Sequence, residues 1–300
     1  ILMFNIESLE ELELINQRAG ALGGRAPIAI RVNPDVDPKT HPYISTGLRR
    51  NKFGIDTATA MEAYAIARKM ANIDIVGIDC HIGSQITEVQ PFRDALENLV
   101  GLIEKLTRAG IGIKYLDMGG GLGITYDKEL PPALDEYARV IVDLLQEISV
   151  TLLLEPGRVI VGNAGILVTR ALYRKAGEIK NFVIVDAGMN DLLRPTLYDA
   201  YHAIRPVRRS DGPSWQADLV GPICESSDFL GLDREVPVAV NGELLAVMSA
   251  GAYGFSMASN YCSRPKLAEV MVKGDQFSVV RRRQTYEDLT AGETVPPFLE

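Results

Sequence analysis

Two turns that combine glycine with charge follow two successive apolar runs of the sequence. Gly119-Gly120-Gly121-Leu122-Gly123 follows the strand-like run 113–118, and Glu155-Pro156-Gly157-Arg158 follows the run 150–154. Successive backbone N–H groups without Cβ atoms suit a phosphate that approaches a strand-to-helix turn. Because ligand chemistry collects at the carboxyl ends of strands in a repeating β/α chain, we expect both turns to face one pocket.

Each of these turns also has an interpretation without function. The glycines do not match the G-x-G-x-x-G fingerprint in register, and a tight turn that merely requires glycine is the alternative. Glu155 and Arg158 are three residues apart, so a local ion pair that contributes little would also explain them. The two turns together favour an anion site more than either does alone.

A third strand end carries a histidine. His81 follows the apolar run 73–80 and precedes Gly83 and Ser84. An imidazole there can stack on a flat ring or transfer protons, and the Gly-Ser step offers donors to a phosphate. A satisfied core histidine is the alternative, but a position at a strand end on the same predicted barrel face favours a functional role.

The second half of the chain contains three further groups of candidates. Arg194 and Tyr198 belong to a polar segment that follows a buried run, where an ordinary loop needs no such mixture. Cys224 lies beside Glu225 in a turn, and a thiol flanked by acids is at least partly exposed and could donate a proton. Tyr253 lies between glycines and can reach a phosphate, although packing is the commoner role of a loop aromatic.

Residues 1–163 are predicted to form part of a (β/α)8 barrel. Near-continuous apolar runs predict parallel strands covered on both faces, and helical periodicity fills the stretches between them. A closed barrel needs eight strands in roughly 250 residues. The sequence therefore predicts the α/β fold class, in the form of a partial TIM barrel with about five of the eight strands. The expected strands are 1–6, 27–32, 73–80, 113–118 and 150–154, and the expected helices are 9–19, 57–71, 90–109 and 131–147.

Residues 164–300 are predicted to form a second domain of antiparallel β-sheet. Helical periodicity largely ends after residue 164, and short apolar runs alternate with turns such as Asn241-Gly242. The expected strands are Val168–Tyr173, Phe182–Asp186, Asp218–Val220, Val236–Val240, Leu244–Met248 and Gln276–Arg282.

Composition argues against several classes of protein. The net charge is −8, and no basic stripe with interleaved aromatics occurs, which argues against nucleic acid as a partner. No apolar run reaches the ~18 residues that a membrane span requires, so no membrane association is expected. Cys80, Cys224 and Cys262 are too few and too scattered for a disulfide framework or a zinc site, and a cytoplasmic protein is expected.

Six segments together resemble the diaminopimelate decarboxylases, pyridoxal-phosphate enzymes with an alanine-racemase-like fold. Their joint order and spacing make coincidence remote, and the resemblance covers nearly the whole chain. It implies pyridoxal 5'-phosphate as the cofactor, an amino acid as the substrate, and conversion of meso-2,6-diaminopimelate into L-lysine and CO2. The segments are HIGSQ at 81–85, GGGLG at 119–123, EPGR at 155–158, DAGMNDLLRPTLY at 186–198, CESSD at 224–228 and GAYG at 251–254.

The resemblance also implies roles toward the cofactor. His81 would stack on its ring, and Glu155 would hydrogen-bond the pyridine nitrogen and keep it protonated. A protonated ring is the stronger electron sink for loss of CO2, whereas an arginine at this position would favour racemisation. The remaining residues expected to contact the cofactor are Ser84, Gly119, Gly120, Gly121, Gly123, Pro156, Gly157, Arg158 and Tyr253.

By the same resemblance, the substrate is held mainly by residues of the second half. The arginines would bind a carboxylate, and Glu225 would recognise the distant ammonium group. Cys224 would return a proton to the substrate in the active site of the neighbouring subunit, which implies a homodimer with shared active sites. The expected substrate contacts are Arg158, Arg194, Tyr198, Glu225 and Tyr253.

The sequence departs from the family pattern at its start. The family's Schiff-base lysine lies in a Tyr-Ala-x-Lys-Ala-Asn-like motif on the first barrel strand, and no such motif occurs here. Lys52 is rejected because it belongs to a segment that the family has in addition to that lysine. Since the chain opens on a buried-strand pattern at Ile1, we expect an amino-terminally truncated fragment that is inactive by itself. Cys262 replaces an expected asparagine, which affects only a minor contact near the cofactor.

Three alternative functions remain open at this point. A related decarboxylase of ornithine, arginine or carboxynorspermidine is the nearest one, but Arg194, Tyr198 and Glu225 favour a substrate with a second carboxylate. A non-catalytic fragment is the second. A phosphate-binding barrel for flavin or a sugar phosphate is the third, and it leaves Cys224 and Glu225 without a role.

Overall fold

The computed structural model describes residues 1–37, 52–208, 213–237 and 241–299. The chain divides into two compact units, Ile1–Ile160 and Val161–Glu300. The sequence analysis expected a domain boundary between residues 163 and 164, a few residues further along the chain.

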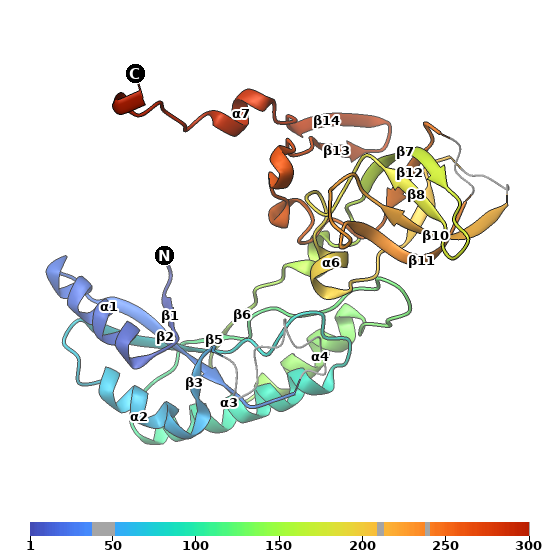
Figure 1. The fold of residues 1–300 in the computed structure, drawn as a ribbon. Helices are drawn as coiled ribbons and strands as arrows, with labels where there is room; N and C mark the ends of the chain where they lie inside the picture. Colours follow the sequence, from blue (N-terminus) through green and yellow to red (C-terminus); the bar gives the residue numbers. More distant parts are fainter. Residues whose placement is uncertain (38–51, 209–212, 238–240, 300) are drawn as a thin grey trace. The chain divides into compact units, whose positions relative to one another are not determined.

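The first unit is built on a parallel sheet with the strand order β1-β2-β4-β5-β6 (Figure 1). Its short additional strand β3 pairs with β2. The sheet confirms the α/β fold class and is consistent with part of a barrel. The strands are β1 (Phe4–Ile6), β2 (Ala26–Asn33), β3 (Ile55–Asp56), β4 (Ile73–Asp79), β5 (Tyr115–Asp117) and β6 (Thr151–Leu153).

Helices follow the strands in alternation, and α2, α3 and α4 lie along one face of the sheet (Figure 1). The helix α3 buries an apolar face that includes Leu96, Leu99 and Leu106, each with no exposed surface. Burial of such a stripe against the sheet is the main source of stability for a helix of this kind. The helices of this part of the chain are α1 (Leu9–Ala21), α2 (Thr57–Ala67), α3 (Gln90–Arg108), α4 (Leu134–Leu145) and α5 (Arg158–Val161).

Ser8 is the N-cap residue of α1. The Ser8 hydroxyl accepts a hydrogen bond from the Glu11 N–H at 3.1 Å. The Glu11 carboxylate accepts from the N–H of Glu7, at 2.6 Å, rather than from that of Ser8. One backbone donor that the helix leaves without a partner, the Glu11 N–H, is thereby satisfied, as is the Glu7 N–H before the cap.

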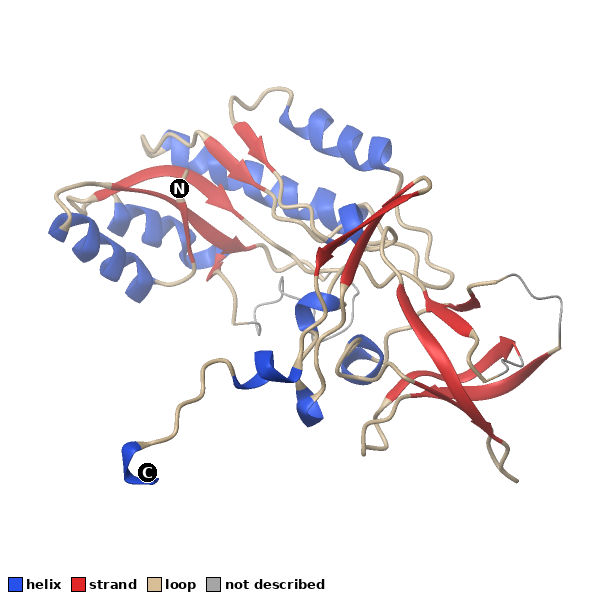
Figure 2. Cartoon of the chain, turned by 90° about the horizontal axis from the view of Figure 1, so that it is seen from above, coloured by secondary structure: helices blue, strands red, loops and turns tan. Residues whose placement is uncertain are grey.

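The second unit contains a β-sheet with the strand order β11-β10-β8-β7-β12-β9. Figure 2 draws the strands of the chain in red. The pairs are antiparallel apart from β8 and β10, which are parallel, so this sheet is mixed. The strands are β7 (Leu167–Lys175), β8 (Phe182–Val185), β9 (Ile204–Pro206), β10 (Ser214–Val220), β11 (Phe229–Pro237) and β12 (Leu244–Val247).

The end of the chain forms a separate hairpin of β13 (Glu269–Lys273) and β14 (Gln276–Arg281). The short helices of this unit are α6 (Arg194–Tyr198) and α7 (Tyr286–Thr290). Sequence analysis did not predict β9 or β13. Of the expected strand Val236–Val240, residues 238–240 lie outside the described part of the chain.

Within the described residues, none of the helices is both long and apolar enough to span a membrane. The thiols of Cys80, Cys224 and Cys262 are not engaged in disulfides, and only that of Cys80 is buried.

Candidate functional site

The two glycine-containing turns of the first unit are in direct contact. The Glu155 N–H donates a hydrogen bond to the Gly119 carbonyl at 2.8 Å. A Cβ atom on Gly120 would overlap the carbonyl oxygen of Glu155, so this approach requires glycine. The ends of β5 and β6 therefore meet at one place, as the sequence predicts.

The turn after β4 joins the same place. The Ile86 N–H donates to the Gly121 carbonyl, and the Gly123 N–H donates to the Ile86 carbonyl, both at 2.9 Å. Gly121 has a φ of +104°, and a Cβ atom there would overlap the carbonyl oxygen of Gly83. Three consecutive strand ends thus form one continuous backbone surface.

Arg158 holds the positive charge of this surface. It lies at the start of α5 and is only 6% exposed. Its guanidinium donates to the Tyr126 hydroxyl at 2.6 Å and to the Ser84 hydroxyl at 2.9 Å. The structure therefore brings Arg158 and Ser84 together beside the glycines, an arrangement that suits an anionic group. Tyr126 was missed in the sequence because a tyrosine beyond a glycine turn carries no distinctive pattern.

Carboxylates cluster at the ends of the same strands. Asp117 accepts a hydrogen bond from the Gly119 N–H at 2.9 Å. Asp79 is 3% exposed, and burial, reinforced by the charge of Asp117, raises its pKa to about 8. Its Oδ2 atom lies 4.0 Å from Arg31, while its Oδ1 atom has no hydrogen-bond partner among the described residues. The sequence analysis assigned no role to Asp79 or Asp117.

Glu155 lies in the same electrostatic environment. Burial and then the charge of Asp117 raise the pKa of its carboxyl, while Arg31 opposes the shift. Arg31 also forms an ion pair with Glu7 at 2.6 Å. Glu155 is consequently a carboxyl group whose protonated form is favoured more than in water.

The imidazole of His81 is held by the glycine turn. The Gly120 N–H donates to its Nδ1 atom at 3.1 Å. Burial, followed by the charge of Arg31, lowers the pKa of His81 to about 4. The ring is therefore neutral near pH 7, with its proton on Nε2, because Nδ1 acts as an acceptor.

In the second unit, the carboxylate of Glu225 is held by two hydroxyl groups. Tyr261 donates a hydrogen bond to Oε1, and Ser227 donates to Oε2 at 3.1 Å. The Ser227 carbonyl in turn accepts from the Thr196 hydroxyl at 2.6 Å, which ties this turn to α6. Glu225 itself remains exposed, so its charge is accessible to a ligand.

Asp228 holds the loops around Glu225 together. Its carboxylate accepts from the N–H groups of Met189 and Ile223, both at 2.6 Å. A Cβ atom on Gly221 would lie 2.6 Å from the Cα atom of Gly188, so the two loops touch without side chains between them. Burial raises the pKa of Asp228, and the two backbone donors oppose that shift.

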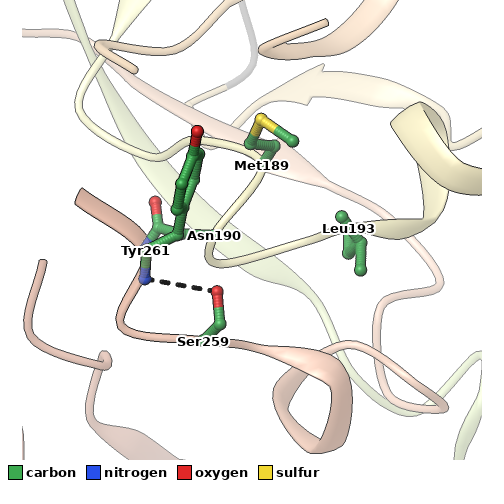
Figure 3. A pocket seen from close by; sticks show the side chains of 5 residues that line it. All are labelled: Met189, Asn190, Leu193, Ser259 and Tyr261. Atoms are coloured by element: carbon green, nitrogen blue, oxygen red, sulfur yellow. Dashed lines mark hydrogen bonds between the residues drawn. The ribbon is translucent and has the colours of Figure 1, made fainter. Parts of the chain in front are cut away.

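A small cavity of about 330 Å³ lies beside these loops (Figure 3). The Tyr261 N–H donates to the Ser259 hydroxyl at 3.3 Å at its edge. Ser259 and Tyr261 were not predicted from the sequence, because they follow a short 3-10 helix without a strand end to mark them. The lining residues are Met189, Asn190, Leu193, Ser259 and Tyr261.

The other expected residues of the second unit differ in exposure. Arg194 is 5% exposed, whereas the thiol of Cys224 is exposed. Tyr253 is 42% exposed and has a φ of +59°, an uncommon conformation for a tyrosine. Tyr198 ends α6 and is partly buried. The roles assigned to all these residues stay predictions.

Comparisons with known proteins agree with this geometry. Residues 1–162 match the family described as pyridoxal-dependent decarboxylase, pyridoxal binding domain. The chain is 54% identical to the diaminopimelate decarboxylase of Aquifex aeolicus over 290 residues, covering 96% of this chain and 69% of that protein. It is also 54% identical to that of Pseudomonas aeruginosa over 294 residues, covering 98% and 71%.

A solved structure of this family is also similar to this chain. The diaminopimelate decarboxylase of Helicobacter pylori, complexed with L-lysine, superposes with a TM-score of 0.93 at 45% sequence identity. The match covers 97% of this chain and 73% of that one.

The pKa of His81 makes a prediction about its titration. The ring should stay neutral as the pH falls through 6.5 and should protonate with a midpoint near pH 4. Because the unfolded chain binds this proton first, the contribution of His81 to stability is complete above about pH 6.5 and decreases as the pH falls toward 4. An NMR titration of the imidazole protons measures the midpoint, and His81→Gln assigns the resonance among the three histidines. A midpoint near 6.5 would contradict the burial described above.

Proposed function

Since the chain belongs to the diaminopimelate decarboxylase family, whose cofactor is pyridoxal phosphate, we propose that it removes the D-centre carboxylate of meso-2,6-diaminopimelate and yields L-lysine and CO2. The observation that carries the proposal is the junction of Glu155 with the glycine turn, where the Glu155 N–H donates to the Gly119 carbonyl at 2.8 Å. This contact supports a single site in which an acid and an anion cradle serve the same small molecule.

The residues of the first unit fit the cofactor. Gly120 and Gly121 have no space for a Cβ atom, because the carbonyl oxygens of Glu155 and Gly83 lie there, so glycine keeps the strand ends packed together around the place where the phosphate would bind. Arg158 and Ser84 would supply charge and a hydroxyl beside those glycines. The buried Oδ1 atom of Asp79, which has no hydrogen-bond partner among the residues that the structure describes, indicates a polar region that a bound group could complete.

The cofactor, when bound, supplies the electron sink that accommodates negative charge at the α-carbon as CO2 leaves. Glu155 would hold a proton at the pyridine nitrogen, and its raised pKa supports close proton sharing. His81 would lie against the ring as a neutral imidazole, which adds no charge of its own. These two side chains would thus orient the ring and maintain its protonation state.

The residues of the second unit would select the substrate and handle its proton. Glu225, oriented by Tyr261 and Ser227, would bind the distal ammonium group. Arg194 and Tyr198, together with Arg158 of the first unit, would bind the carboxylate that is retained, and Tyr253 would contact the cofactor and the substrate. The exposed thiol of Cys224 would deliver a proton to the α-carbon in the partner subunit's site. The proposal therefore includes a homodimer with shared active sites.

Substrate choice tests the proposed function directly. The full-length protein, supplied with pyridoxal phosphate, should release L-lysine and CO2 from meso-diaminopimelate. Ornithine should be turned over at least about 100-fold less efficiently, because it leaves the carboxylate-binding arginines without a partner. Amino-acid analysis of the products measures both reactions. Turnover of ornithine without formation of lysine would instead support the related decarboxylases.

Shared active sites predict complementation between two inactive variants. Arg158→Ala should disable the cofactor half of a site, and Cys224→Ala should disable the proton donor. If the two halves come from different subunits, an equal mixture of the variants should recover about a quarter of the normal activity, because half of the dimers then contain one intact site. Mixtures that stay inactive after subunit exchange would exclude the shared arrangement.

The lysine that binds the cofactor covalently gives a separate prediction. These 300 residues contain no Tyr-Ala-x-Lys-Ala-Asn-like segment. We therefore expect that borohydride reduction of the 300-residue chain with pyridoxal phosphate leaves no stable label on a lysine at stoichiometric yield. Mass spectrometry of the peptides locates any label, and Lys52 is the first position to inspect. A single fully labelled lysine would contradict this expectation.

A further inference from the structure

His202 connects Arg194 to the end of β12. The side chain of His202 has no exposed surface, and that of Arg194 is almost as deeply buried. The Nη1 atom of Arg194 lies 2.9 Å from Nε2 of His202. The other ring nitrogen, Nδ1, lies 2.8 Å from the carbonyl oxygen of Met248.

The partners of the two ring nitrogens determine where the proton is. A carbonyl oxygen can only accept, so Nδ1 of His202 must carry a hydrogen. A guanidinium can only donate, so Nε2 must present a lone pair to Arg194. A doubly protonated ring would place an N–H group against the guanidinium N–H at 2.9 Å. The geometry therefore requires the neutral Nδ1–H tautomer of His202.

The backbone around the ring is fixed as well. The Met248 N–H donates to the Ala203 carbonyl at 2.8 Å, next to the contact between the ring and the Met248 carbonyl. At the other end, α6 is capped by Asp199, which has a φ of +50° and whose N–H donates to the Arg194 carbonyl. His202 is thus anchored to the sheet and to the helix that begins with Arg194.

We propose that His202 is a positioning residue that holds the Arg194 guanidinium ready for the carboxylate that the substrate retains. An arginine side chain has several rotatable bonds, and fixing them beforehand removes an entropic cost from binding. The inference rests on the proposed function, in which Arg194 binds this carboxylate.

Two ligands distinguish the contribution of the carboxylate to binding from the contribution of the other contacts in the site. L-lysine contains the retained carboxylate, whereas cadaverine is the same chain without it. Calorimetric titration of the holoenzyme with each ligand gives two dissociation constants, and their ratio isolates the contribution of the carboxylate. Because cadaverine still reports on the other contacts, a variant that is misfolded is recognised by the loss of both ligands.

Two matched variants separate the two contacts of His202. In His202→Asn, the amide nitrogen can still donate to Met248, but the shorter side chain no longer provides the acceptor that Nε2 offers to Nη1 of Arg194. In His202→Gln, the amide oxygen can accept from Arg194, but the contact with Met248 is lost. We expect His202→Asn to weaken L-lysine binding about 10-fold and His202→Gln to weaken it by less than about 3-fold, with cadaverine binding changed less than about 2-fold in both.

The outcomes distinguish this inference from the proposed function. Equal loss of L-lysine binding in both variants, or no loss in His202→Asn, would overturn the positioning role. Arg194→Gln is the reference: it should weaken L-lysine binding more than His202→Asn does, and adding His202→Asn to it should have no further effect. If Arg194→Gln leaves the ratio of the two dissociation constants unchanged, the proposed role of Arg194 fails, and the role of His202 fails with it.

Discussion

The hydrogen bond from the Glu155 N–H to the Gly119 carbonyl is the contact on which the first unit's site depends. It fixes the end of β6 against the end of β5, and it forms only because Gly120 leaves the Glu155 carbonyl unobstructed. A tight backbone contact of this kind specifies the position of the Glu155 side chain more firmly than a contact between flexible side chains would. Glu155 and the glycine turn 119–123 are therefore parts of one rigid turn pair.

Burial at this turn pair raises the pKa of an acid and lowers the pKa of a base. It raises the pKa of Asp79 to about 8 and lowers that of His81 to about 4, since a poorly solvated site disfavours charge of either sign. Arg31 lowers the pKa of each group but is not the largest contribution to either shift. Because burial disfavours charge, Asp79 and His81 are favoured in their neutral forms. Such surroundings suit a ligand that brings its own charges, such as a phosphorylated, protonated ring.

The sequence predicted the elements of the first unit well because parallel strands and amphipathic helices each have a strong pattern. All five expected strands have counterparts, and the expected helix 131–147 begins only at Leu134, after the two prolines. Two strands of the second unit were missed. Strand β9 has three residues and ends in Pro206. Strand β13 has only three apolar residues between Glu269 and Lys273.

For the site, strand ends and family motifs indicated the residues that we propose to contact ligands, but not the residues that hold them in place. Tyr126, Asp117, Tyr261 and His202 contact Arg158, Gly119, Glu225 and Arg194, respectively. Such supporting residues are defined by a partner far away in the sequence or by the direction of a side chain. Neither property leaves a local pattern that sequence reasoning could use.

The two carboxylates of the segment 224–228 show how burial decides the role of an acid. Asp228 is 3% exposed and accepts two backbone N–H groups, so its charge is compensated within the protein and unavailable to a ligand. Glu225, three residues earlier, is exposed and accepts only from hydroxyl groups in the contacts described above. Hydroxyl donors orient a carboxylate without neutralising it, which leaves Glu225 the acid of this segment that can bind an ammonium group.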